Sequence, residues 1–203
     1  MGDYSQSIIE TAKKIYQMPL LDVDDIPRID LYMEQVTSFF DEALGDLRRR
    51  EDDKILTKTM INNYTKYGIL EHPNRKKYNK EHLISLVYVA LLKQVLTIQD
   101  IKTFFDVLPT DSAETKGLSP IYTAFNKMVD DYRGQYANKV ESMIERIDKN
   151  LETVGIEDND DARMVMMVSL LATEAAAHKL LAGRLLDEYM ARREASAEGK
   201  DNK

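Results

Sequence analysis

The feature that most limits how this chain can fold is a regular seam near its C-terminus. Apolar and small residues recur there at alternating steps of four and three: Met164, Val168, Leu171, Ala175, His178, Ala182, Leu185 and Tyr189. This heptad spacing is typical of a helix that packs lengthwise against another helix. A helix with so apolar a face does not stand alone in water. We therefore predict that residues 160–190 bury this face against a second long helix or against a second copy of the chain.

Helical spacing extends over most of the remaining chain. Steps of three and four link the apolar residues of a second long segment, which are Tyr122, Phe125, Val129, Tyr132, Tyr136, Val140, Met143, Ile147 and Leu151. The alternating pattern of half-buried strands is nearly absent. The sequence therefore predicts an all-α protein that ends in a long helical hairpin over residues 119–193.

Capping residues place the shorter helices. Polar side chains that accept hydrogen bonds from free helical amides precede each apolar run, and the expected N-caps are Asp30, Thr57, Asn79, Thr97 and Ser119. Asp100, three residues after Thr97, fits a relative of the capping box. Gly68 is expected to close the helix that starts at Thr57, because glycine adopts the left-handed conformation at low cost. The helix after Asp30 is expected to run to about Leu47.

Changes in composition divide the chain into parts. Residues 1–26 are expected to form a short helix and a linker, and residues 27–108 a compact helical unit. The turn-forming stretch "LPTDSAETKGLSP" separates this unit from the hairpin. Residues 194–203 are polar and are expected to form a flexible tail.

Composition argues against most enzyme classes. The chain has no cysteine, which excludes thiolate chemistry and disulfides. Glycine-rich phosphate loops, nucleophile elbows and zinc-binding HExxH motifs are absent from the sequence. Glu174 and His178 lie one helical turn apart and could hold a metal in a helical-bundle enzyme, but a hydrogen-bonded histidine in the seam is the simpler interpretation. We predict a protein that is not an enzyme and holds no cofactor or metal.

The N-terminal stretch "MGDYSQSIIETAKK" lacks an apolar core of signal-peptide length, and no run approaches the roughly 20 apolar residues that span a bilayer. We therefore expect a cytoplasmic protein without membrane contact.

Charge is unevenly distributed along the chain. The formal net charge is −7, yet residues 48–93 contain eleven Lys and Arg against five acidic residues, which leaves about −13 for the remainder. Because salt screens charges beyond about 10 Å, the local surplus decides what this segment can contact. An acidic chain with a basic segment can bind a polyanion locally.

The basic segment contains residue types that recognise DNA. A helix that starts at Thr57 directs Lys58, Asn62 and Lys66 away from its apolar side. Asparagine can form paired hydrogen bonds with adenine in the major groove, and lysines hold phosphates. Tyrosine can pack its ring in the core while its hydroxyl reaches a phosphate, although packing alone explains it equally well. The predicted DNA-binding residues are Thr57, Lys58, Thr59, Asn62, Asn63, Tyr64, Lys66, Arg75, Lys76, Lys77 and Tyr78.

Residues 56–105 also resemble a known arrangement. The segment "TKTMINNYTKYGIL" resembles the second helix of the helix-turn-helix in MerR-type regulators. The continuations "KKYNKEHL" and "LLKQVLTIQDIKTFF" resemble the end of that family's wing and its next two helices. The whole sequence is similar to bacterial domain-of-unknown-function family 1836, thought to carry such a domain. The resemblance implies a winged-helix-like unit that binds double-stranded DNA, followed by a dimerisation helix.

Two departures from the MerR pattern have structural consequences. The first and second helices are separated by "DEALGDLRRREDDKIL", so the turn between them must be longer or the first helix extended. The segment "EHPNRKKY" lacks the glycine of a hairpin tip, which implies a shortened wing.

These observations predict a sequence-specific transcriptional regulator that acts as a homodimer. The expected dimerisation residues are Val168, Leu171, Ala175, His178, Ala182 and Leu185. An effector molecule cannot be identified from the sequence. The alternative is a helical adaptor that uses the same basic surface to bind an acidic protein partner.

Overall fold

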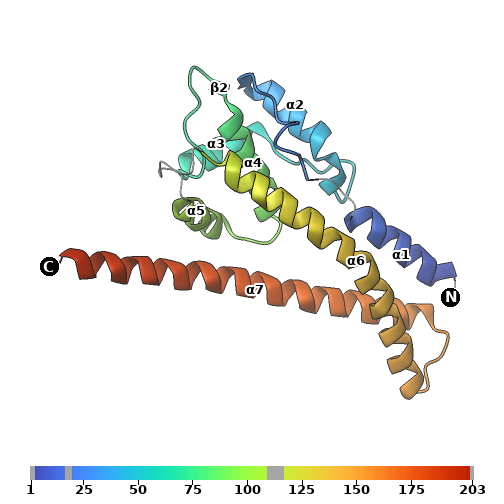
Figure 1. Ribbon diagram of the computed structural model, residues 1–203. Helices are drawn as coiled ribbons and strands as arrows, with labels where there is room; N and C mark the ends of the chain where they lie inside the picture. The colour runs from blue at the N-terminus through green and yellow to red at the C-terminus, as the bar shows by residue number, and fades with distance from the viewer. Residues whose placement is uncertain (1–2, 17–19, 109–116, 202–203) are drawn as a thin grey trace. The chain divides into compact units, whose positions relative to one another are not determined.

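The computed structural model describes residues 3–16, 20–108 and 117–201, with side chains described for all but 3–5, 16, 134–138 and 197–201. Two compact units can be distinguished. The larger unit comprises Leu20–Asn126 and Lys179–Lys203, and the smaller unit comprises Met1–Pro19 and Lys127–His178. Apart from one two-stranded sheet, the regular elements described are helices, which confirms the all-α prediction (Figure 1).

The larger unit contains the short elements in the middle of the chain. Their bounds are β1 (Leu31–Tyr32), α2 (Met33–Ala43), the 3-10 helix η1 (Gly45–Leu47), α3 (Lys58–Lys66), β2 (Lys77–Tyr78), α4 (Lys80–Leu92) and α5 (Ile98–Val107). The long helix α6 (Ser119–Thr153) begins in the same unit. Helix α4 is central to the core, because nine consecutive residues from His82 to Ala90 are buried. A helix buried on all sides shows little amphipathic periodicity, so its sequence marks no single core face.

Three of the expected caps are confirmed. Thr57 Oγ1 accepts a hydrogen bond from Met60 N at 3.1 Å. Asn79 Oδ1 accepts from His82 N at 3.0 Å, and Thr97 Oγ1 accepts from Asp100 N at 3.2 Å. Each hydroxyl or amide oxygen satisfies an amide that the helix itself leaves free.

Helix α3 closes where expected. Gly68 has φ = +68°, the left-handed conformation that favours glycine. The amides of Ile69 and Leu70 then both donate to the carbonyl of Tyr64.

The prediction for the first helix of this unit is wrong at both ends. Asp30 is not the cap, because the chain forms β1 at Leu31–Tyr32 and α2 starts only at Met33. At the other end α2 stops at Ala43. The Arg48 guanidinium then donates to the carbonyls of Asp41 and Gly45, at 3.0 and 3.1 Å. The connection to α3 is therefore the longer of the two alternatives, a 14-residue segment over 44–57.

The start of α6 differs by one residue from the expectation. Ser119 lies inside the helix, and its hydroxyl donates to Glu81 Oε1 at 2.9 Å. The other carboxylate oxygen of Glu81 accepts from Leu118 N at 2.6 Å, so one side chain of α4 fixes the start of α6. The preceding boundary stretch lies mostly outside the described residues.

The smaller unit packs three helical segments together. These are α1 (Asp3–Tyr16), the part of α6 from residue 127 to 153, and the part of α7 (Asp160–Asp201) up to residue 178. Their core consists of Ile9, Val140, Met143, Ile144, Ile147, Leu151 and Met167. At the turn between α6 and α7, the Arg163 guanidinium contacts the carboxylates of Asp148, Asp158 and Asp160 at 2.6–3.2 Å. Those three carboxylates raise the pKa of Arg163, which is charged in any case.

The heptad seam of α7 is not buried within one chain. Helix α7 packs into the smaller unit mainly through Ala162, Met166 and Met167, none of which is a seam residue. Val168 and Leu185 are 56% and 57% exposed. The prediction that residues 160–190 bury this face against residues 122–151 is therefore wrong. The alternative, that a second copy covers it, stays a prediction.

Helix α7 bears on two expectations about the C-terminus. It continues to Asp201, through the segment expected to be a flexible tail. By length and composition it is also long and apolar enough to cross a membrane, since its most apolar 18-residue window has a mean hydropathy of 1.4 and 6% of that window is buried. The expectation of a protein without membrane contact stays a prediction. The same composition suits a helix that packs against protein.

Candidate nucleic-acid interface

Helix α3 has one polar, exposed face. Lys58, Thr59, Asn62, Asn63 and Lys66 are all exposed. On the opposite side Ile61 and Tyr64 are buried, which fixes the rotation of the helix against the core. Two amides and two ammonium groups therefore lie along one outward ridge, with side chains that match base edges and phosphates.

The two candidate tyrosines belong to the core. Tyr64 is 8% exposed and Tyr78 is 3% exposed. Burial raises the pKa of both phenols, because the charged phenolate loses its hydration there. Thr57 is half-buried and its hydroxyl serves as the α3 cap. These three residues support the ridge by holding α3 in place.

Lys58, at the start of the ridge, has an acidic neighbour. Its ammonium lies 2.6 Å from Glu34 Oε1 of α2. This hydrogen bond is the main cause that lowers the pKa of the Glu34 carboxyl. The charge of Lys58 is partly balanced in the free protein, so an anion must compete with Glu34 for it.

A tight basic turn lies between α3 and α4. Lys77 N donates to Asn74 O at 2.9 Å, and the same two residues form an isolated bridge. Arg75 and Lys76 occupy the two central positions with φ values of +49° and +64°. We call residues 74–77 the basic turn. Positive φ at both central positions is the signature of a type I′ turn, which normally takes asparagine and glycine.

The basic turn is anchored by the two-stranded sheet. β2 pairs antiparallel with β1, with Leu31 opposite Tyr78 and Tyr32 opposite Lys77. The Lys77 ammonium lies 5.3 Å from the centre of the exposed Tyr32 ring, within the range of a cation–π contact. Tyr32 is a neighbour of the candidate site that sequence reasoning missed, because this pairing joins segments about 45 residues apart.

Lys93 belongs to the basic segment, but its ammonium is directed to the protein interior. Its ammonium donates to the carbonyl of Ile55 and lies 4.0 Å from Met60 Sδ. Burial lowers the pKa of Lys93. It holds the residues before α3 against the core, which removes one charge from the count available for a ligand.

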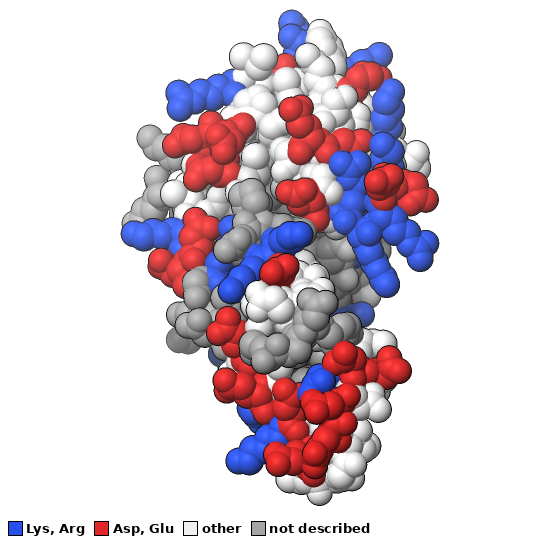
Figure 2. Space-filling view, turned by 90° about the vertical axis from the view of Figure 1, so that its right-hand side faces the viewer, with Lys and Arg blue, Asp and Glu red and all other residues white. Residues whose placement is uncertain are grey.

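Acidic side chains occupy a different part of the surface. Figure 2 shows one face of the molecule, on which basic side chains form a group with acidic side chains beside it. The acidic residues around the turn from α6 to α7 include Asp148, Glu152, Glu157, Asp158 and Asp161. The acidic surplus outside residues 48–93 thus includes a group of side chains on the smaller unit.

Glu174 and His178, the two residues considered for metal binding, lie one turn apart on α7. Glu174 forms an ion pair with Lys139 at 3.0 Å. His82 is buried beside Asn79, and burial is the main cause that lowers its pKa, against the opposing charge of Glu71. Within residues 3–16, 20–108 and 117–201, no cluster of three His, Asp or Glu is arranged to hold a metal ion.

Comparison with known proteins places the larger unit in a family. The family model called Domain of unknown function (DUF1836) matches residues 21–127, which nearly coincide with the N-terminal part of the larger unit, Leu20–Asn126. The chain matches none of the curated proteins and none of the solved structures. Because the match covers more than half of the 203 residues, the chain belongs to the DUF1836 family.

Proposed function

We propose that this protein is a sequence-specific DNA-binding transcriptional regulator that acts as a homodimer. The observation that supports it most is the basic turn. Arg75 and Lys76 occupy left-handed positions that cost an ordinary residue about 1–2 kcal/mol each. Asparagine and glycine would fold more easily there. Residues other than glycine in a left-handed conformation point to a role outside folding, and two exposed cations suit contact with phosphates.

The neighbouring ridge supplies the second half of the proposal. In this arrangement α3 lies in the major groove as a MerR-like recognition helix, and Asn62 and Asn63 contact base edges. The basic turn serves as a short wing that contacts the backbone. Lys58 and Lys66 add phosphate contacts at the two ends of the helix. Base contacts would then select the sequence, and the cations would supply most of the affinity.

Self-association is proposed through the exposed seam of α7. Two antiparallel copies, related by a two-fold axis between Ala176 and Ala177, place the seam residues in complementary layers. Met164 then lies opposite Tyr189, Val168 opposite Leu185, Leu171 opposite Ala182, and Ala175 opposite His178. A larger side chain faces a smaller one in the two central layers, which fills the seam evenly.

Charge favours the same arrangement. Asp161 and Arg192, which follow the seam spacing at its two ends, come to lie opposite each other in the antiparallel pair. A parallel pair in register would place Asp161 against Asp161 and Arg192 against Arg192, which is repulsive. It would also leave Ala175 and Ala182 facing copies of themselves. The apolar composition of α7 is then explained by a protein partner.

The proposal is tested by selecting DNA fragments from a genomic or random pool with the purified protein. An enriched two-fold symmetric site, bound by a dimer, is the expected result. Binding should weaken when Lys76 is replaced by alanine, whereas Lys149→Ala, on the acidic smaller unit, should have little effect. Equal, salt-sensitive binding to all duplexes would contradict sequence-specific regulation. No DNA binding at all would leave the adaptor as the better explanation.

A further inference from the structure

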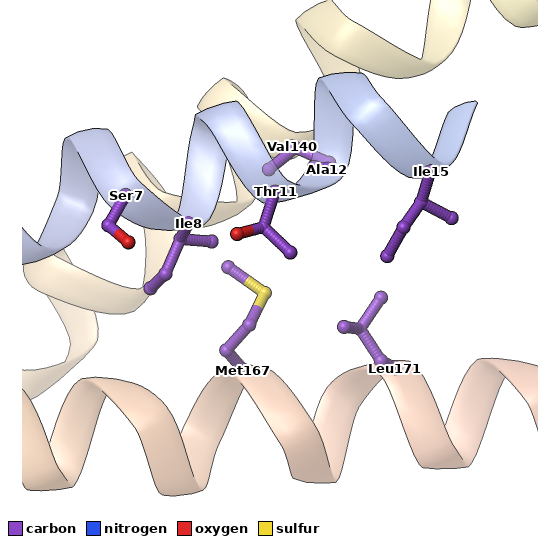
Figure 3. Close-up of a pocket in the computed structure, with 8 residues that line it drawn as sticks. All are labelled: Ser7, Ile8, Thr11, Ala12, Ile15, Val140, Met167 and Leu171. Carbon is purple, nitrogen blue, oxygen red and sulfur yellow. The ribbon is translucent and has the colours of Figure 1, made fainter. Parts of the chain in front are cut away.

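The smaller unit contains an apolar pocket that shares Leu171 with the proposed dimer seam and is otherwise separate from it. Its volume is about 320 Å³, and it is lined by Ser7, Ile8, Thr11, Ala12, Ile15, Val140, Met167 and Leu171. Figure 3 shows the side chains of α1 pointing toward Met167 and Leu171 of α7, with Val140 of α6 behind them. We propose that this pocket binds a small, neutral, largely apolar molecule that carries one hydrogen-bonding group.

The floor of the pocket is apolar and adaptable. Val140 and Met167 are buried, at 4% and 5% exposure, whereas Ile15 and Leu171 form a more exposed rim. The flexible thioether of methionine adjusts its shape to an apolar guest. A dry cavity of about 150 Å³ holds benzene, so roughly twice that volume suits a body of about ten carbon atoms. The size lies at the lower end of the range of ligand pockets in proteins.

The lining carries no charged side chain, so a charged guest would lose its hydration without compensation. The nearby charges of Lys13 on α1 and Glu141 on α6 form an ion pair with each other at 3.7 Å. The uncharged lining therefore favours a neutral guest.

The hydroxyl of Thr11 supplies a polar anchor. Elsewhere in the helices of this chain, threonine hydroxyls such as those of Thr65, Thr103 and Thr173 donate to a carbonyl one turn earlier. Thr11 has no hydrogen-bond partner among the described residues, and its side chain projects into the pocket (Figure 3). Thr11 is exposed, so its hydroxyl is accessible to donate to, or accept from, one polar atom of a guest.

The pocket is tested with three probes of one shape, using the full-length protein labelled with ¹³C at its methionine methyl groups. The probes are 2-naphthol, which is neutral and carries a hydroxyl; naphthalene, which lacks the hydroxyl; and 2-naphthoate, which is charged. We expect 2-naphthol to shift the Met167 methyl signal, identified by its loss in Met167→Leu, with a Kd on the order of 10–100 µM. Naphthalene should bind more weakly and 2-naphthoate least.

Two variants and a control separate the anchor from the apolar floor. Thr11→Val keeps the shape and removes the hydroxyl, so it should weaken 2-naphthol about 2- to 10-fold and leave naphthalene unchanged. Ala12→Leu should fill the pocket and abolish binding of both. Thr173→Val, outside the pocket on α7, should change neither. Circular dichroism shows whether each variant is folded, and a misfolded Ala12→Leu protein is replaced by Ala12→Val.

Three outcomes would overturn the proposal. One is the absence of a Met167 shift at saturating 2-naphthol. Another is equal binding of 2-naphthoate, and a third is binding that neither pocket variant affects. The 2-naphthol titration is run at one fixed protein concentration, because dimerisation through Leu171 would by itself shift the signal of the neighbouring Met167.

Discussion

Replacing the central residues of the basic turn should move stability and DNA binding in opposite directions. In the double variant Arg75→Asn/Lys76→Gly, both left-handed positions receive residues that adopt positive φ readily. Relief of the left-handed conformation at Lys76 should stabilise the folded state by about 1–2 kcal/mol. Glycine loses more conformational freedom on folding, which offsets about 0.5–1 kcal/mol of that gain. Together with a smaller gain at Arg75, the net stabilisation should be about 1 kcal/mol. For a chain of this size that raises the melting temperature by about 2–4 °C.

The same substitutions remove two cations from the proposed wing. Each phosphate contact adds about 0.9 to the slope of log affinity against log salt concentration. If both cations contact phosphates, the slope should become shallower by about 2, and affinity at low salt should fall for specific and random duplexes alike. A matched variant, Arg75→Gln/Lys76→Gln, removes the same charges but keeps the unfavourable backbone. It should lose the same binding without gaining stability.

Thermal unfolding and DNA titration at two salt concentrations measure the two effects on the same protein samples. Unchanged stability of the Asn-Gly variant would refute the argument that the turn is strained. Unchanged affinity and salt slope in both variants would remove the basic turn from the DNA interface.

The ridge, the seam and the buried histidine each give a further prediction. Asn62→Ala or Asn63→Ala should cost about 1–3 kcal/mol on the preferred DNA site and leave affinity for random duplexes nearly unchanged, as measured by competition titration; equal losses on both would exclude base contacts. In this cysteine-free chain, a mixture of Leu171→Cys and Ala182→Cys proteins should form a mixed disulfide. Ala182→Cys alone should not form a disulfide between two copies. Its two Cα atoms would be offset by about 16 Å along an antiparallel pair, and a disulfide needs Cα atoms less than about 7 Å apart. Efficient self-linking of Ala182→Cys would instead indicate a parallel pair. Burial lowers the pKa of His82, so the unfolded chain binds more protons than the folded chain as the pH falls. The contribution of His82 to stability should therefore be full above about pH 6.5 and decrease below it. His82→Gln should flatten this dependence, as measured by chemical denaturation at several pH values.

Features that depend on neighbouring residues were predictable from the sequence. Thr57, Asn79 and Thr97 cap their helices because a cap is formed by a side chain and an amide three residues away. Gly68 ends α3 for an equally local reason, its positive φ. The exposed ridge of α3 followed from helical spacing once the start at Thr57 was known.

Features that depend on distant contacts were not predictable in this way. The local sequence predicts Asp30 as a cap, because nothing nearby indicates that Leu31–Tyr32 pairs with Lys77–Tyr78. The absence of glycine suggested a shortened wing, but Arg75 and Lys76 still form a tight turn by adopting the left-handed conformation themselves. The pairing across β1 and β2 supplies the constraint that holds them there.

The apolar pocket could not be predicted from the sequence, because it also depends on contacts between distant segments. It joins α1 to parts of α6 and α7 that follow more than 120 residues later, so no local pattern connects Thr11 with Met167. The seam of α7 was visible as a pattern, but periodicity alone does not say whether the face it defines meets the same chain or another one.

The two ends of the DUF1836 region meet in the folded protein, and this bears on how such a chain could have arisen. The carbonyl of Leu21 accepts hydrogen bonds from the Tyr122 hydroxyl and, at 3.0 Å, from Asn126 Nδ2, so the first and last residues of the region are held together. The smaller unit is built from segments on either side of it. A module whose entry and exit coincide can be inserted into a host without separating the host's own helices. Residues 21–126 thus interrupt the smaller unit between its α1 and α6 segments, and a short linker in their place should leave that unit able to assemble.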